Sequence, residues 1–276
     1  MQLFRRSILQ VIVSGALCST LPNLAFAQTQ KLASEYDVIV IGSGFAGLAA
    51  AISAAENGAK VAVLEKMQVA GGNSSRSGGM MAIPGSSVQK EQGIEDSPAK
   101  LAADMKRIGL GLGDPEHIKV VTEHAAPTFE WTKKQGVVWR TDLTGKGGHS
   151  ARRCLITEEG TGQGILIPFM KKLKELGVPV FTGMKVIRLD KNKDGRVICV
   201  TALEDYKFGK EDSGKPVEIK AKDGVILAFG GFSADVGYRT RLDPKLTGNL
   251  KTTNQPGATA ELMREASRIG ANIIQA

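Results

Sequence analysis

The chain has 276 residues, 42% of them hydrophobic, with 33 glycines and a formal net charge of +8. This length and composition exclude a disordered or fibrous protein and fit one large domain or parts of two. The basic charge is spread along the chain without interleaved aromatic residues, so it does not indicate nucleic-acid binding. A mildly basic surface instead favours anionic substrates.

The first 27 residues differ in composition from the rest. Arg5 and Arg6 precede an apolar stretch over 8–17 and a small-residue end, the layout of an export signal cleaved after Ala27. The run FRRSILQ resembles a twin-arginine signal, which exports proteins that have already collected a cofactor, and Sec export is the alternative. The mature part then carries 34 basic and 28 acidic side chains. The sequence predicts a periplasmic protein, with no later run long enough for a stable membrane anchor.

The remaining chain, 36–276, is predicted to form one α/β domain. A strand over 37–41, a helix over 46–57 and a strand over 60–65 form a βαβ unit. Apolar periodicity and capping residues predict further helices over 98–108, 115–135, 165–176 and 258–269. Short strands are predicted over 178–181, 185–189, 197–203, 217–222 and 225–229, as a β meander that returns to the parallel sheet at the last of them. The final run GANIIQA is strand-like and lacks a polar tail, so we expect the fold to continue past it.

The run VIVIGSGFAG at 38–47 carries the pattern G-x-G-x-x-G between a buried strand and a helix. Gly42 permits a tight turn, Gly44 lets the backbone approach a pyrophosphate, and Gly47 lets helix and strand pack closely. Glu65 ends the second strand roughly 20 residues later, where an acid that accepts hydrogen bonds from an adenosine ribose is expected. Together these features predict a dinucleotide site, and the alternative is a structural turn with coincidental glycines.

The next segment bears on the choice between NAD and FAD. The run AGGNSSRSGGM at 70–80 supplies several backbone donors and a small, flexible wall. A second ring system can lie against such a wall, and a simple nicotinamide domain does not need one. The segment therefore favours FAD, and the alternative is a surface glycine loop.

These residues resemble the flavoprotein family of fumarate reductases, soluble flavocytochrome c enzymes and urocanate reductases. The matching runs extend over 37–276 and are VIVIGSGFAGLAAA, the EK after the second strand, GGNSSRSGGM, GGHSARR, VILAFGGF, TTNQPGAT and GANIIQA. The resemblance implies a Rossmann-like FAD-binding domain with a parallel sheet. It also implies that the complete protein has a second, capping domain, which we expect to be missing from this chain.

The resemblance assigns FAD contacts to individual residues. They are Gly42, Gly44, Ala46, Gly47, Glu65, Lys66, Gly72, Asn73, Ser74, Gly78, Gly79, Val186, Ala228, Gly230, Gly231 and Glu261. Val186 takes the backbone position beside the adenine, and Phe229 stands where the family has Thr or Ser. Glu261 stands where the family has an acid, usually Asp between glycines. Gly79 and Gln275 are also implied as substrate contacts.

In the family, reduced FAD passes a hydride from N5 to a C=C bond beside a carboxylate, and an arginine delivers the proton. The resemblance thus implies reduction of a small unsaturated mono- or dicarboxylate, similar to fumarate or urocanate. No catalytic residue is assigned, because we expect the proton donor beyond residue 276. The sequence has no C-x-x-C-H, so we expect a separate electron donor such as a periplasmic cytochrome.

Several alternatives stay open on the sequence alone. The chain is alternatively a truncated, inactive flavin-binding remnant, a related FAD dehydrogenase of the succinate or ketosteroid type, or a non-enzymatic binding protein. Arg152 and Arg153 in GGHSARR, beside His149, are either carboxylate-binding groups or residues that meet phosphate, surface acids or solvent. His117 and His124 have no Cys or acid at ligand spacing, so no metal site is predicted.

Overall fold

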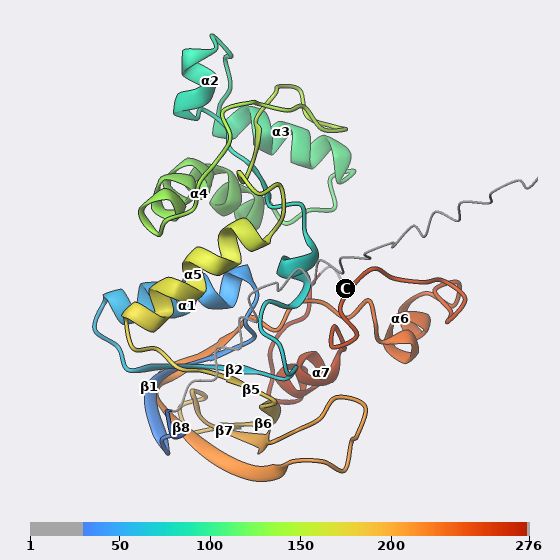
Figure 1. Ribbon diagram of the computed structural model, residues 1–276. Coiled ribbons are helices and arrows are strands. Elements are labelled where there is room, and N and C mark those ends of the chain that lie inside the picture. The colour runs from blue at the N-terminus through green and yellow to red at the C-terminus, as the bar shows by residue number, and fades with distance from the viewer. Residues whose placement is uncertain (1–29, 275–276) are drawn as a thin grey trace, which may run out of the picture.

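The computed structural model describes residues 30–274 (Figure 1). The predicted export signal and Gln275 lie outside the described residues. Within them, one sheet has the strand order β5-β2-β1-β8-β7-β6. Its strands are β1 (Glu35–Ile41), β2 (Val61–Glu65), β5 (Val180–Thr182), β6 (Lys185–Lys191), β7 (Val197–Glu204) and β8 (Lys215–Leu227). Neighbours from β5 to β8 pair in parallel and those from β8 to β6 pair antiparallel, which confirms the α/β fold with a parallel sheet and a meander.

Helices cover one face of the parallel strands, and the meander together with one further helix packs against the other face. The helices are α1 (Phe45–Glu56), α2 (Ser87–Glu91), α3 (Pro98–Ile108), α4 (Pro115–Lys134), α5 (Gln163–Glu175), α6 (Val236–Leu242) and α7 (Glu261–Arg268). Figure 1 shows α1 and α5 above the sheet, α7 near β6, and α2, α3 and α4 stacked beyond α5. A short hairpin of β3 (Met80–Ala82) and β4 (Cys154–Ile156) and a 3-10 turn, η1 (Gly72–Arg76), complete the described elements.

Strand β1 is buried on both faces. Successive side chains along a strand point to opposite faces, so its residues contribute to two separate cores. Ile39 and Ile41 pack into a core formed with the meander, which includes Val200, and with Leu262 of α7. Val40 points the other way, into the core that α1 and α5 build on the sheet. The sheet is therefore fixed from two sides, and the carboxyl ends of its parallel strands lie at one well-ordered edge.

Strand β8 corrects the prediction of two strands over 217–222 and 225–229. Its first half pairs antiparallel with β7, and its second half, from Lys220 to Leu227, pairs in parallel with β1. Asp223 and Gly224 resemble a turn in the sequence. They are instead absorbed by a shift of register opposite β1, so that one strand links the meander to the parallel sheet.

Two further strand predictions need correction. The strand predicted over 178–181 is β5, which joins the parallel sheet beside β2 instead of the meander. Gly183, with φ +65°, turns the chain between β5 and β6. Residues 271–274 of the final apolar run form no strand, and Ile273 and Ile274 are 39% and 52% exposed, because no described strand pairs with them.

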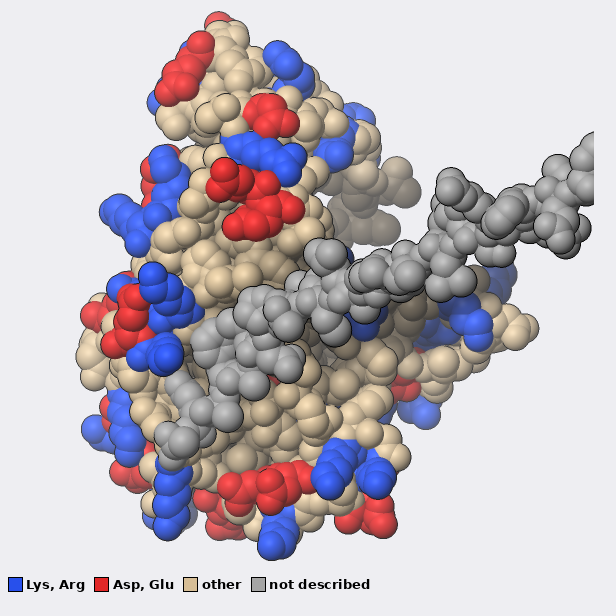
Figure 2. All heavy atoms as spheres, viewed as in Figure 1, with Lys and Arg blue, Asp and Glu red and all other residues tan. Residues whose placement is uncertain are grey.

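The predicted long helices are present within a few residues of their expected bounds, whereas α2, α6 and the β3–β4 hairpin were missed because they are too short to show periodicity. In the part of the chain described here, no helix is both long and apolar enough to cross a membrane. On the face drawn in Figure 2, basic and acidic side chains are interspersed instead of forming one patch of a single sign.

Candidate cofactor site

The turn after β1 brings the ends of two strands against the start of α1. Gly42 has φ +105°, and a Cβ there would lie 2.3 Å from the carbonyl oxygen of Ala228, just after β8. A Cβ at Gly47 would lie 1.9 Å from the carbonyl oxygen of Gly42. No side chain tolerates either distance, so this close approach requires glycine at both positions. That these glycines also contribute to cofactor binding remains a prediction from the sequence.

The start of α1 faces the glycine-rich segment that contains η1. The Phe45 amide donates to Ser74 Oγ over 2.9 Å, and a Cβ at Gly44 would lie 3.1 Å from that oxygen. Within the described residues, no acceptor is found for the amides of Ala46 and Gly47. These amides stand at the positive end of the helix dipole and are available to an anion.

Two adjoining cavities follow the carboxyl edge of the sheet. The first, of about 170 Å³, is called the loop cavity and is lined by Gly42, Ser43, Gly44, Phe45, Ala46, Glu65, Met67, Gly72, Asn73, Ser74, Ala228, Phe229, Gly230, Gln255, Gly257 and Ala258. The second, of about 70 Å³, is called the acid cavity and is lined by Ile41, Gly42, Leu64, Glu65, Lys66, Met184, Lys185, Val186, Phe229, Gly257, Thr259, Glu261 and Leu262. Four shared residues, Gly42, Glu65, Phe229 and Gly257, join them into one groove.

This groove has the features that a dinucleotide requires. A Cβ at Gly72 or Gly230 would meet no atom within 4 Å, so the backbone at both positions faces open space. A phosphate group can approach the main chain there and reach the free amide of Ala46, which lines the loop cavity. The acid cavity places the Glu65 carboxylate beyond this amide, where a ribose is expected. The residues present therefore fit FAD.

Glu65 is buried and its carboxylate is already held by the protein. Oε2 accepts from Ser43 N (3.1 Å) and Ser43 Oγ (2.5 Å), and Oε1 accepts from Met67 N (2.8 Å). A carboxylate offers about four acceptor positions. One therefore remains, on Oε1, for the ribose hydroxyl predicted to bind there.

Ser43 links Glu65 to the glycine-rich segment. Its hydroxyl donates to Glu65 and accepts from the Gly71 amide over 2.9 Å, and Gly71 immediately precedes η1, which carries Asn73 and Ser74. The glycine motif alone does not point to a role for Ser43. A hydroxyl between the first two glycines of the motif, with an acid at the end of the next strand, is the signal that points to it.

Replacing Ser43 with alanine is expected to weaken FAD binding about tenfold. The change leaves the buried Gly71 amide without its acceptor and removes the hydroxyl's hydrogen bond to Glu65, at a cost of about 1–3 kcal/mol. Titration of FAD against the apoprotein, followed by quenching of flavin fluorescence, measures the effect. Ser53→Ala, on the exposed side of α1, is the matched control and should bind FAD as the wild type does. Equal affinities of the two variants would contradict the linking role of Ser43.

The far wall of the groove comes from the TTNQPGAT run. The Gln255 amide donates to Asn73 Oδ1 over 2.6 Å, which ties this run to η1. Lys66 Nζ donates to Thr259 Oγ1 over 2.6 Å and lies 3.3 Å from Glu261 Oε1. Burial by itself raises the pKa of Glu261, but the Thr259 hydroxyl and the nearby Lys66 ammonium lower it overall. Glu261 is therefore an anion at neutral pH.

Four predicted FAD contacts, Gly47, Gly78, Gly79 and Gly231, line neither cavity. Gly79 has φ +62°, its carbonyl accepts from the Thr157 amide over 3.0 Å, and a Cβ there would lie 2.2 Å from the Thr161 carbonyl oxygen. The structure thus brings together the other twelve predicted contacts along the groove and holds Gly79 in a separate, tightly packed turn.

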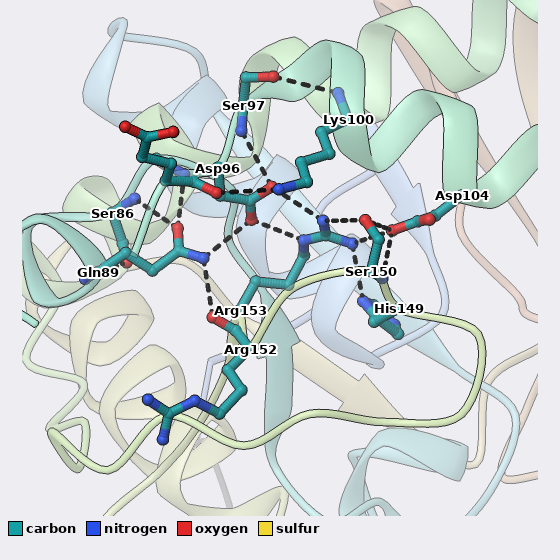
Figure 3. Close-up of polar contacts among 12 residues, drawn as sticks. Ser86, Gln89, Asp96, Ser97, Lys100, Asp104, His149, Ser150, Arg152 and Arg153 are labelled. Atoms are coloured by element: carbon teal, nitrogen blue, oxygen red, sulfur yellow. Dashed lines mark hydrogen bonds and ion pairs between the residues drawn. The ribbon is translucent and has the colours of Figure 1, made fainter. Parts of the chain in front are cut away.

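The GGHSARR run forms a buried ion cluster (Figure 3). Arg153 is fully buried, donating from Nε and Nη2 to Asp96 over 2.7 and 2.8 Å and from Nη1 to Asp104 over 2.6 Å. The hydrogen bond from Arg153 holds the pKa of Asp104 well below its usual range. Arg153 therefore pairs with acids, but these acids are buried and not at the surface as the sequence suggested, whereas Arg152 is exposed.

The histidines have structural surroundings. His149 Nδ1 lies 3.1 Å from Arg153 Nη1, and because a guanidinium only donates, Nδ1 accepts in this hydrogen bond. His117 and His124 are exposed on α4. Within residues 30–274 no group of three or more His, Cys, Asp or Glu side chains is placed to hold a metal ion.

The family profile of the FAD binding domain matches residues 37–276. The chain belongs to this family. FAD is accordingly its cofactor, as the sequence predicted. The chain is 41% identical to the acrylate reductase flavoprotein subunit of Shewanella woodyi, over 91% of this chain and 50% of that protein. It is 38% identical to urocanate reductase of Eggerthella lenta, over 89% of this chain and 40% of that protein.

The fold is similar to that of a flavocytochrome c3 fumarate reductase in its open conformation. The TM-score is 0.80 at 27% sequence identity, over 88% of this chain and 42% of that chain. The chain therefore spans about half the length of the relatives it matches. By their names, these relatives are reductases of acrylate, urocanate and fumarate.

Proposed function

We propose that this chain supplies the FAD-binding part of an exported oxidoreductase that reduces the C=C bond of a small unsaturated carboxylate. The observation that carries the proposal is the groove at the carboxyl edge of the sheet, in a chain 41% identical to an acrylate reductase flavoprotein subunit. FAD bound in this groove supplies hydride transfer to the substrate double bond. The similarity to urocanate reductase supports the same class of substrate.

The residues of the groove bind and orient the two halves of the cofactor. The amides of Ala46 and Gly47 neutralise the pyrophosphate, and the free acceptor position on Glu65 Oε1 holds the ribose. Phe229 lines both cavities and presents a ring to the cofactor in place of a hydroxyl. Charge and hydrogen bonds thus fix the adenosine end of FAD. Apolar contact holds the part of FAD that lies at the junction between the two cavities.

Gly79 is proposed to contact the substrate carboxylate through its backbone. Its position is fixed, because the Thr157 amide and the Thr161 carbonyl confine it. Gln275 is proposed as a second substrate contact. We assign no proton donor among the described residues. For electron supply, a separate donor such as a periplasmic cytochrome is proposed, since the sequence carries the export-signal layout and lacks C-x-x-C-H.

Turnover by the product of the complete gene, isolated with its FAD, tests this proposal. Acrylate, urocanate and fumarate are each supplied with reduced methyl viologen, and oxidation of the dye is followed by absorbance. We expect turnover of at least one of the three and a flavin spectrum that is bleached by the dye and restored by that substrate. A protein that binds FAD but oxidises viologen with none of them would be a flavin-binding remnant or an enzyme of another class. Absence of bound flavin would instead remove the cofactor assignment.

A further inference from the structure

The connection between β7 and β8, residues 205–214, folds back against the wall of the acid cavity and is called the strap (Figure 1, orange loop below α7). The Tyr206 amide donates to the Gly183 carbonyl over 2.8 Å, and Gln68 Nε2 donates to the Tyr206 carbonyl over 2.6 Å. Tyr206 is 1% exposed. Asp205 enters the strap with φ +60°, a conformation that non-glycine residues adopt only when their surroundings hold them there. The strap is therefore fastened to the protein at its first residues.

The charged side chains of the strap continue into the acid cavity. Glu211 Oε2 lies 2.6 Å from Lys185 Nζ, and Lys185 Nζ lies 3.8 Å from Glu261 Oε1. The next contact joins Glu261 Oε1 to Lys66 Nζ over 3.3 Å. Acids and bases therefore alternate from the strap to the residue that follows Glu65.

Glu211 is exposed but tightly held. Its side chain is 69% exposed and lines neither cavity, whereas the Lys185 side chain that it contacts is 11% exposed and lines the acid cavity. Tyr206 Oη donates to Glu211 Oε1 over 2.7 Å, and Lys185 Nζ lies 4.7 Å above the Tyr206 ring. An isolated surface ion pair contributes little. Here the carboxylate is fixed on both oxygens and its lysine is nearly buried, so the pair constrains the cavity wall.

That wall is clamped from two sides. The amides of Gly183 and Met184 donate to the carbonyls of Met67 and Glu65 over 3.0 and 2.8 Å, and the strap holds the same turn from the outside. Met184, Lys185 and Val186 are consecutive and all line the acid cavity. Any loosening of the strap therefore moves a surface that faces the adenosine end of the groove.

We propose that Glu211 is a positioning residue for the adenosine half of FAD. It holds Lys185, and through Lys185 the wall 184–186, without itself contacting the cofactor. The inference goes beyond the proposed reaction and depends only on FAD occupying the groove. It assigns to the strap a control of cofactor retention, because a mobile wall releases the adenosine end more readily.

The test compares Glu211→Gln with Asp212→Asn in the full chain. Both substitutions remove one negative charge from the strap, but Asp212 is exposed and has no hydrogen bond or ion pair with any described residue. FAD affinity is measured by fluorescence titration, and release by capture of the freed flavin on an excess of another apoflavoprotein. ADP, which carries only the adenosine half with the pyrophosphate, is measured as a competitor. Lys185→Gln and the double variant complete a cycle.

We expect Glu211→Gln to weaken FAD and ADP by the same factor, about fivefold, mainly through faster release, and Asp212→Asn to leave both unchanged. In the Lys185→Gln background, Glu211→Gln should add less than a twofold effect. A general loss of stability would not produce this shared, Lys185-dependent factor. If Glu211→Gln binds FAD and ADP within twofold of Asp212→Asn, the strap has no positioning role. A wild-type chain that binds no FAD would overturn the groove and the strap together.

Discussion

Gly47→Ala is expected to abolish FAD binding. The new Cβ would lie 1.9 Å from the Gly42 carbonyl oxygen, a backbone atom, and 3.4 Å from Ala228 Cβ. The Gly42 turn cannot move away, because its amide donates to the Leu64 carbonyl over 2.9 Å. The backbone of Ala228 also packs directly against it, so closely that a Cβ at Gly42 would lie 2.3 Å from the Ala228 carbonyl oxygen. Helix α1 must therefore shift, which moves the amides of Ala46 and residue 47 away from the phosphate position. Overpacking against a fixed backbone costs about 3 kcal/mol or more, equivalent to at least about a 100-fold loss of affinity.

The measurement is a titration of FAD against the apoprotein, with circular dichroism to report folding. Gly237→Ala is the matched control, because Gly237 is exposed in α6 and a Cβ there would meet nothing nearer than 3.7 Å. That variant should bind FAD normally and gain up to about 1 kcal/mol in stability from helix propensity. A folded Gly47→Ala protein with wild-type affinity would show that the close approach of α1 is not required.

Arg153→Met is expected to destabilise the protein by about 3–5 kcal/mol at pH 7. The guanidinium pairs with two buried carboxylates, Asp96 and Asp104, and its removal leaves Asp96 without a cation and Asp104 with only the exposed Arg107. The cluster joins α3 to the segment that leads into β4 (Figure 3), so the helical unit above α5 should loosen first. Denaturant unfolding followed by circular dichroism measures the loss. Arg152→Met, which changes an exposed neighbour, should cost less than about 0.5 kcal/mol.

The cost of Arg153→Met should also depend on pH. In the wild type, hydrogen bonds from Arg153 contribute to lowering the pKa values of Asp96 and Asp104. A lowered folded-state pKa gives stability that is present above the unfolded pKa, about 3.9, and is lost as pH falls through the folded pKa. In the variant, Asp96 stays buried without its cation, which raises its pKa, so acidification neutralises this unpaired charge. The difference in stability should therefore shrink between pH 7 and pH 4. A constant difference would mean that the loss comes from packing alone.

Local patterns in the sequence determined the nucleotide-binding half of the fold. The run at 38–47 and the acid at position 65 predict strand, turn, helix and strand, because these properties depend on neighbouring residues and on glycine geometry. The long helices follow from apolar periodicity and capping residues for the same reason. Twelve of the predicted FAD contacts come together in the groove, since the motifs that carry them are short and local in character.

Only the tertiary structure decided the features that depend on residues distant in sequence. Whether Arg153 was a ligand-binding group or a structural one depended on Asp96 and Asp104, which no local pattern links to it. The continuity of β8 was decided by its two partners, β1 and β7, which override a turn-like Asp-Gly pair through their hydrogen bonds. The contact between Glu211 of the strap and Lys185 could not be predicted from local patterns either, because these two residues meet only after the chain has formed two further strands. The sequence by itself thus determined the cofactor and the family, and long-range packing decided how the walls of the site are held.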